Sequence, residues 1–186
     1  KKSISAARLM NVKDGQNEHL WYNPETMSRL ADELVNVFSK KMPSKKAEFK
    51  QNAATYKKKV ARLNSELEKI RAERIEKPVA VSEPVFDYSL EKMGYKVANA
   101  HFAKAVEEES DPSYTDIKNL QNKIKRKEIA FFVYNVQSDG TTVKNIVNLC
   151  KKHDIPVVKV TETLPEGKNY FNWLQSEYRQ IAEIEK

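Results

Sequence analysis

Apolar residues between positions 44 and 76 recur at alternating spacings of four and three. This spacing places them on one face of a single helix; they are Phe49, Ala53, Tyr56, Val60, Leu63, Leu67 and Ile70. Ser44 is a suitable N-cap, and Pro43 and Pro78 bound the span, which contains no other Pro and no Gly. At about 1.5 Å per residue the helix would be about 50 Å long. Such a helix must pair with another helix or brace two separate bodies.

A shorter amphipathic helix is predicted immediately before the long one. Asn23 is placed to be its N-cap and Pro24 to take its first position. The pattern ends near Met42. Its apolar residues share one face of the helix; they are Met27, Leu30, Ala31, Leu34, Val35 and Phe38.

Short apolar runs alternate with helical segments after Pro78. The expected strands span 78–82, 95–98, 129–134 and 155–160. The expected helices between and after them span 85–93, 113–127, 141–153 and 169–185. This alternation predicts an α/β fold in which helices flank a four-stranded parallel sheet. The chain therefore divides into a helical segment at 1–43, a bracing helix at 44–76 and an α/β lobe at 77–186.

Composition and charge indicate a globular protein with a basic helix. Among the 186 residues, 32% are charged and 40% are hydrophobic, which is typical of a globular protein. The net charge is +7, and the span 44–76 supplies +5 of it, from ten Lys or Arg against five Glu. A basic helix could bind nucleic acid or an acidic partner. The basic residues are mixed with glutamates, however, so a solvated outer face is the favoured interpretation.

Polar residues follow three of the predicted strands. Glu83 follows the first, Asn135 and Gln137 the third, and Glu162 the fourth. Ligands of parallel α/β sheets gather beyond the carboxyl ends of the strands, so Glu83 and Glu162 are expected to lie close together there. The alternative is that both are ordinary loop glutamates. His19, next to Leu20 and Trp21, could be either a core residue or a ligand.

Several enzyme classes lack their sequence signatures. The chain has no Gly-x-Ser-x-Gly nucleophile elbow, no glycine-rich phosphate loop and no Cys-x-x-Cys or His-Glu-x-x-His metal motif. The single cysteine, Cys150, lies in an apolar helical segment and is expected to be a small core residue. His153 is expected at the surface, and the role of His101 stays open. These observations favour a binding module over an enzyme.

The order of these segments resembles one protein family. The segments are Asn17-Glu18-His19-Leu20-Trp21-Tyr22-Asn23-Pro24, the long helix, Ser82-Glu83-Pro84-Val85-Phe86, Tyr134-Asn135-Val136-Gln137 and Val160-Thr161-Glu162-Thr163-Leu164-Pro165-Glu166-Gly167. Together they resemble the zinc and manganese receptors of bacterial ABC importers, many of them lipoproteins. The resemblance covers essentially the whole chain. It implies two α/β lobes joined by a rigid helix, with the N-terminal lobe largely absent here.

The resemblance also implies a metal site. His19, Glu83 and Glu162 match three ligands of the family, whereas the histidine that supplies the first ligand has no counterpart in this chain. Glu18 stands where the family often has Pro. A set of two nitrogens and two carboxylates suits Mn²⁺, although Zn²⁺ binds most such sites more tightly. Manganese is favoured and zinc stays open, and the isolated chain is expected to bind metal weakly.

The implied function is that of an extracytoplasmic, membrane-anchored receptor. It would bind a divalent metal ion and deliver it to an ABC permease as a monomer, without nucleic acid; adhesion to host surfaces is also implied for some members. The alternative is a basic helical module that binds an acidic partner or nucleic acid.

Overall fold

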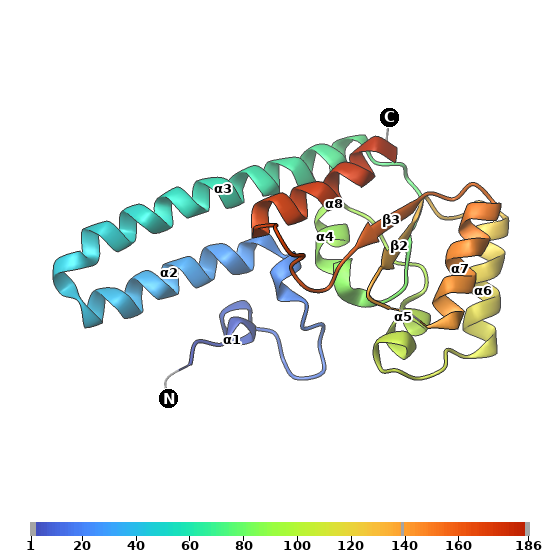
Figure 1. Cartoon of the computed structure of the whole chain (residues 1–186), viewed down its shortest axis with the longest axis horizontal. Coiled ribbons are helices and arrows are strands. Elements are labelled where there is room, and N and C mark those ends of the chain that lie inside the picture. Colours follow the sequence, from blue (N-terminus) through green and yellow to red (C-terminus); the bar gives the residue numbers. More distant parts are fainter. Residues whose placement is uncertain (1–2, 139, 185–186) are drawn as a thin grey trace.

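The long helix is present and unbroken. In the computed structural model, which describes residues 3–138 and 140–184, α3 runs Lys46–Glu73 (Figure 1). A single 3-10 turn, η2 (Pro43–Lys45), precedes it. Its last predicted residues, 74–76, instead lie outside the helix, because Arg74 adopts an extended backbone (φ −59°, ψ 143°) that leads toward Pro78. The predicted helix is therefore confirmed, with ends two or three residues inside those expected.

The first half of α3 pairs with α2 (Pro24–Lys41) as an antiparallel hairpin that extends away from the sheet (Figure 1). As predicted, Pro24 takes the first turn of α2 and the Asn23 side chain accepts a hydrogen bond from the backbone N–H of Glu25. Near the tip, the rings of Phe38 and Phe49 lie 5.7 Å apart. The short elements α1 (Ala6–Met10) and η1 (Leu20–Tyr22) precede α2.

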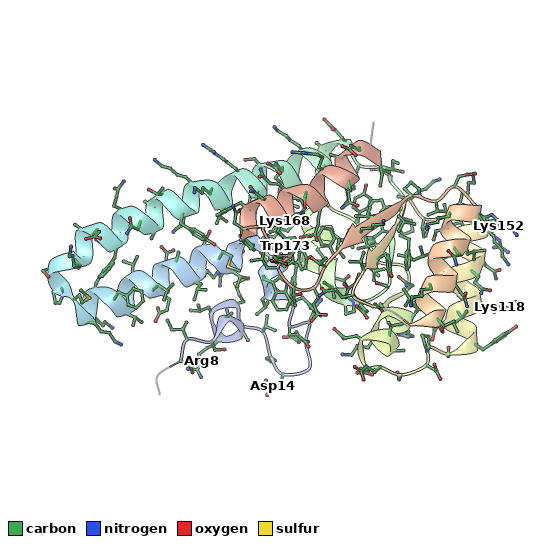
Figure 2. All side chains as sticks on the ribbon, viewed as in Figure 1. Arg8, Asp14, Lys118, Lys152, Lys168 and Trp173 are labelled. Carbon is green, nitrogen blue, oxygen red and sulfur yellow. The ribbon has the colours of Figure 1, made fainter. Side chains whose placement is uncertain are left out.

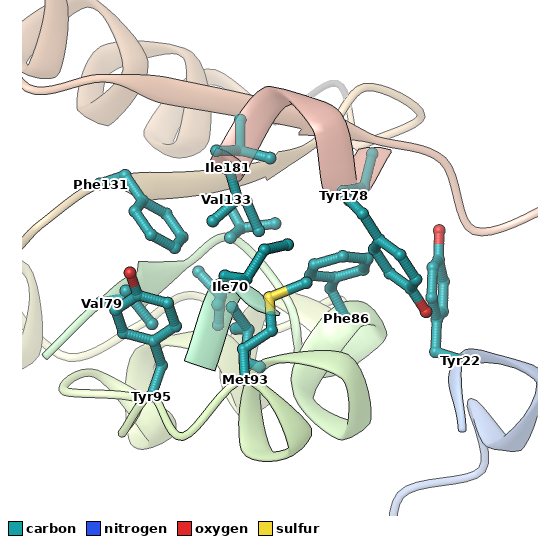
Figure 3. Close-up of a cluster of buried hydrophobic side chains, with 14 of the residues drawn as sticks. Tyr22, Ile70, Val79, Phe86, Met93, Tyr95, Phe131, Val133, Tyr178 and Ile181 are labelled. Carbon is teal, nitrogen blue, oxygen red and sulfur yellow. The ribbon is translucent and has the colours of Figure 1, made fainter. Parts of the chain in front are cut away.

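The second half of α3 packs into the α/β part of the chain. Leu63, Leu67 and Ile70 are 1–4% exposed and belong to a cluster that includes side chains of the sheet and of α8 (Tyr170–Ile184). Figure 3 shows Ile70 in the middle of this cluster, with Tyr22 from the N-terminal segment at its edge beside Tyr178 and Phe86. One helix thus joins the N-terminal hairpin to the sheet.

The sheet is parallel, with the order β1-β2-β3. Its strands are β1 (Ala80–Val81), β2 (Phe132–Asn135) and β3 (Val157–Val160). Successive side chains alternate between its two faces. Val81, Val133 and Val158 join the cluster that contains α3, whereas Ala80 and Phe132 join a second cluster on the opposite face.

The prediction of a fourth strand at 95–98 is wrong within the described residues. This segment forms only an isolated parallel bridge, between Val79 and Val97. The Asn99 side chain explains why pairing stops: its Oδ1 accepts from the N–H of Val81 at 3.0 Å, and its Nδ2 donates to the carbonyl of Val81 at 2.8 Å. The side chain thereby satisfies the backbone groups that a continuing strand would have used.

Helices cover both faces of the sheet. The cluster with α3 and α8 also contains residues of η3 (Pro84–Phe86) and α4 (Asp87–Lys92). The opposite cluster contains residues of α5 (Ala100–Glu107), α6 (Tyr114–Lys125) and α7 (Thr141–Lys152). Lys118 and Lys152 extend from α6 and α7, at the end of the molecule opposite the hairpin (Figure 2). The result is a three-layer α/β/α arrangement.

Cys150 lies in the core, as expected, and burial raises the pKa of its thiol to about 12. His153 is half-buried at the C-cap of α7. Among the described helices, none combines the length and apolarity that crossing a bilayer requires.

The burial of α3 predicts an asymmetric response to substitution. Leu67→Ala should lower the free energy of unfolding by about 2–5 kcal/mol, because it opens a cavity among buried side chains. Lys69→Ala, two residues along on the exposed face of α3, should change it by less than about 0.5 kcal/mol. Urea denaturation of both variants checks this, and equal effects would show that α3 does not anchor the sheet.

Candidate metal site

The three residues expected to bind metal come from three separate segments. Glu83 lies between β1 and η3, Glu162 lies two residues beyond β3, and His19 immediately precedes η1. β1 and β3 lie on either side of β2 and run parallel to it, so all three strands end at the same end of the sheet. Glu83 and Glu162 therefore both lie at this carboxyl end. All three residues line one cavity of about 770 Å³. His101 lines a different cavity, beside α5 and α6.

Asn135, at the end of the central strand, holds Glu83 in place. Its Nδ2 donates to Oε2 of Glu83 at 2.7 Å, and its backbone N–H donates to the Ser82 hydroxyl at 2.9 Å. Gln137, which lines the same cavity, exchanges hydrogen bonds with Thr163 beyond β3. The last residue of β2, Asn135, and Gln137 just beyond it therefore connect to the loops that carry the two glutamates.

His19 is 4% exposed and held on several sides. Its ring makes an edge contact with Trp21, at 5.3 Å between ring centroids. Its Nδ1 lies 2.8 Å from Oδ1 of Asn17 and 3.8 Å from Oε1 of Glu107, an oxygen that is buried and lacks a hydrogen-bond partner. A buried histidine at a cavity wall is thus kept in one orientation.

The cavity wall is acidic although the chain as a whole is basic. Six carboxylates line it, and the lining residues that the structure describes include no Lys or Arg; the six are Glu18, Glu83, Glu107, Glu109, Asp111 and Glu162. A concave surface lined by one sign of charge concentrates ions of the other sign. This cavity therefore suits a cation.

The predicted ligands surround the cavity without converging on a point. Within residues 3–138 and 140–184, no three His, Cys, Asp or Glu side chains lie close enough together to hold one metal ion. The role of His19, Glu83 and Glu162 as ligands therefore stays a prediction.

A buried carboxyl group supports the loops on which His19 and Glu162 lie. Glu177 on α8 is 4% exposed. Its Oε1 accepts from the backbone N–H of Thr161 at 3.0 Å and from Nε1 of Trp173 at 2.9 Å. Its Oε2 lies 3.0 Å from the Tyr22 hydroxyl, which is also 2.5 Å from the carbonyl of Thr161. Glu177 thus joins the residue before Glu162 to the turn that follows His19.

The Tyr22 hydroxyl has one proton, and the Thr161 carbonyl can only accept it. The contact between Tyr22 and Glu177 is therefore satisfied when Glu177 is protonated and donates. Burial raises the pKa of Glu177 to about 7, despite the opposing hydrogen bonds that its carboxyl group accepts from Thr161 and Trp173. Burial, with smaller contributions from Glu91 and Glu107, also raises the pKa of Asp87 to about 7.

Comparisons with known proteins place this geometry in a family. The model of the family described as "Zinc-uptake complex component A periplasmic" (ZnuA) matches residues 2–184. The chain belongs to this family. No curated protein sequence matches the chain.

Several solved structures share the fold of this chain. The periplasmic zinc-binding protein TroA of Treponema pallidum superposes with a TM-score of 0.73 at 14% identity, over 98% of this chain and 71% of that one. Zn(II)-bound AdcAII (E280Q) of Streptococcus pneumoniae gives 0.69 at 17% identity, over 93% and 64%.

The third, FpvC of Pseudomonas aeruginosa in complex with Mn²⁺, gives a TM-score of 0.66 at 16% identity, over 90% of this chain and 64% of that one. The chain thus spans between 64% and 71% of the length of these three structures. At such identities the likeness concerns the fold. The zinc-uptake family itself consists of periplasmic substrate-binding proteins of ABC importers.

The raised pKa of Glu177 predicts a pH-dependent stability. Because folding raises this pKa from 4.5 to about 7, the stabilising contribution is complete below about pH 4.5 and is lost as the pH rises through about 7. Glu177→Gln mimics the protonated acid, since its Oε1 can accept and its Nε2 can donate to Tyr22. The variant should lose less stability between pH 5 and pH 8 than the wild type, by on the order of 1–3 kcal/mol.

Urea denaturation at the two pH values measures this difference. Asp87 contributes its own pH dependence to the stability of both the wild type and Glu177→Gln. The variant Asp87→Asn, measured at the same two pH values, shows how large that contribution is. Parallel stability curves for the wild type and Glu177→Gln would contradict the assignment of a protonated Glu177.

Proposed function

We propose that the chain is the metal-binding part of an extracytoplasmic receptor that passes a divalent transition metal, Mn²⁺ or Zn²⁺, to an ABC permease. The observation that carries the proposal is the acidic cavity at the carboxyl edge of the sheet, lined by His19, Glu83 and Glu162 within an otherwise basic chain. Membership of the zinc-uptake family and structural likeness to proteins solved with Zn(II) and Mn²⁺ support it. The chain acts by binding and release, not as an enzyme.

Each proposed ligand has a distinct chemical role. His19 offers a neutral imidazole nitrogen, which suits Zn²⁺ and Mn²⁺ alike. Glu83 and Glu162 offer oxygens and offset the charge of the cation. The surrounding carboxylates raise the local concentration of cations and thereby increase the rate at which a metal ion reaches the site.

The domain organisation follows from the same proposal. Residues 1–43 would complete one lobe, 44–76 would form the rigid connection, and 77–186 would form the second lobe. The cavity lies between the segment that contains His19 and the sheet edge that carries both glutamates. A receptor of this kind binds its ion where two bodies meet, and it would act as a monomer anchored at the membrane surface.

Three substitutions test the metal site. Glu83→Gln and Glu162→Gln keep the side-chain shape but remove the charge, and His19→Ala removes the nitrogen donor. Each should weaken binding of Mn²⁺ and Zn²⁺ at least tenfold, because an ion gives up its water only where protein ligands replace it. Isothermal titration of MnCl₂ and ZnCl₂ into the 186-residue chain measures the affinities and shows which metal is preferred.

Glu166→Gln is the matched control, because Glu166 is exposed in the loop after β3 and does not line the cavity. It should bind both metals as the wild type does. The free energy of unfolding of the two metal-free glutamate variants should change by no more than about 1 kcal/mol. Wild-type affinity in both of these variants would refute the proposed site.

A further inference from the structure

Asn17 makes four hydrogen-bond contacts around His19. Its Oδ1 accepts from the backbone N–H of His19 at 2.9 Å and lies 2.8 Å from Nδ1 of the same residue. Its Nδ2 donates to the Pro84 carbonyl at 2.7 Å, and its own carbonyl accepts from the Tyr88 hydroxyl at 2.7 Å. The local sequence around Asn17 indicates no role for this residue, because its contacts connect segments 67 and 71 positions apart.

These contacts fix the tautomer of His19. The Pro84 carbonyl can only accept, so the NH₂ group of Asn17 faces it and Oδ1 faces the imidazole. Because Oδ1 is itself only an acceptor, the ring proton must reside on Nδ1. Nε2 then keeps the lone pair that a metal ion requires.

The nearest carboxylate does not share this role in the present geometry. Oε1 of Glu107 lies 3.8 Å from Nδ1, beyond hydrogen-bond distance, and its other oxygen accepts from Lys104 at 3.0 Å. Asn17 is therefore the partner that orients the ring. It also ties the segment carrying His19 to Pro84, the residue directly after Glu83.

We infer that Asn17 is a positioning residue for the metal site: it holds His19 in the Nδ1–H tautomer and couples the loops of His19 and Glu83. This inference rests on the proposed function. Without the Oδ1 acceptor, Nδ1–H loses its partner, the ring can turn, and the proton can move to Nε2 and block coordination. Loss of such a partner of a metal-binding histidine typically lowers metal affinity 10- to 100-fold.

Two readouts test the inference on the 186-residue chain. The ¹⁵N shifts of the His19 ring, recorded without metal at pH 8, report the tautomer directly. Titration with ZnCl₂ reports affinity. The wild type should show Nδ1–H, and Asn17→Ala should lose this signature and bind Zn²⁺ 10- to 100-fold more weakly. Asn17→Asp keeps an acceptor for Nδ1–H, so it should retain the signature and recover most of the lost affinity.

Glu107→Gln is the control for the tautomer, because it removes the charge of the only carboxylate found near Nδ1 in the described part of the chain; it should leave the Nδ1–H signature unchanged. An Nδ1–H signal and wild-type affinity in Asn17→Ala, or loss of both in Asn17→Asp, would overturn the inference. Failure of the proposed function is distinguishable, because it would show as unchanged Zn²⁺ affinity in His19→Ala. Circular dichroism confirms that each variant is folded.

Discussion

The burial of one apolar stripe along α3 organises the whole chain. The first half of the stripe meets α2, and the second half meets α8 and the sheet. Since an α-helix is stiff over this length and a buried Leu or Ile side chain contributes about 1.5–3 kcal/mol, both ends of α3 are held firmly. The position of His19 relative to the sheet edge therefore depends on packing that lies largely outside the cavity.

Side-chain hydrogen bonds between loops hold the walls of the cavity together. Asn135 links the end of β2 to Glu83, and Glu177 links the turn after His19 to the backbone before Glu162. Asn17 completes the set by joining His19 to Pro84. In a low-dielectric interior each of these polar contacts is costly to break without a replacement. Such connections favour a fixed site over a mobile one.

Charge is distributed unevenly between the surface and the cavity. The excess of Lys and Arg lies largely on α3, where Lys57 pairs with Asp32 of α2 and Arg71 approaches Glu68. The carboxylates instead gather where the strands end. Net charge alone would have suggested an anionic partner, whereas the local charge of the cavity selects a cation. The position of charge therefore matters more for function than its sum.

Local sequence determined most of the helices and strands of this protein. The four-three spacing set α3, and Asn23-Pro24 and Ser113 set helix starts that the structure reproduces. The alternation of apolar runs and helices predicted a parallel sheet. Because ligands of such sheets gather at the carboxyl ends of the strands, it also predicted that Glu83 and Glu162 lie near each other, and both line one cavity.

Tertiary structure decided what depends on partners far away in the chain. The segment 95–98 has the composition of a strand, but the Asn99 side chain occupies the backbone N–H and carbonyl of Val81 at the edge of the sheet. Only one bridge, between Val79 and Val97, therefore forms. Glu177 lies 155 positions from Tyr22, so no local pattern could show that its carboxyl group is buried against that hydroxyl. The tautomer of His19 likewise follows from an amide orientation that Pro84 imposes from 67 positions beyond Asn17. Periodicity records which face of an element is buried, whereas these hydrogen bonds arise only when folding brings distant loops together.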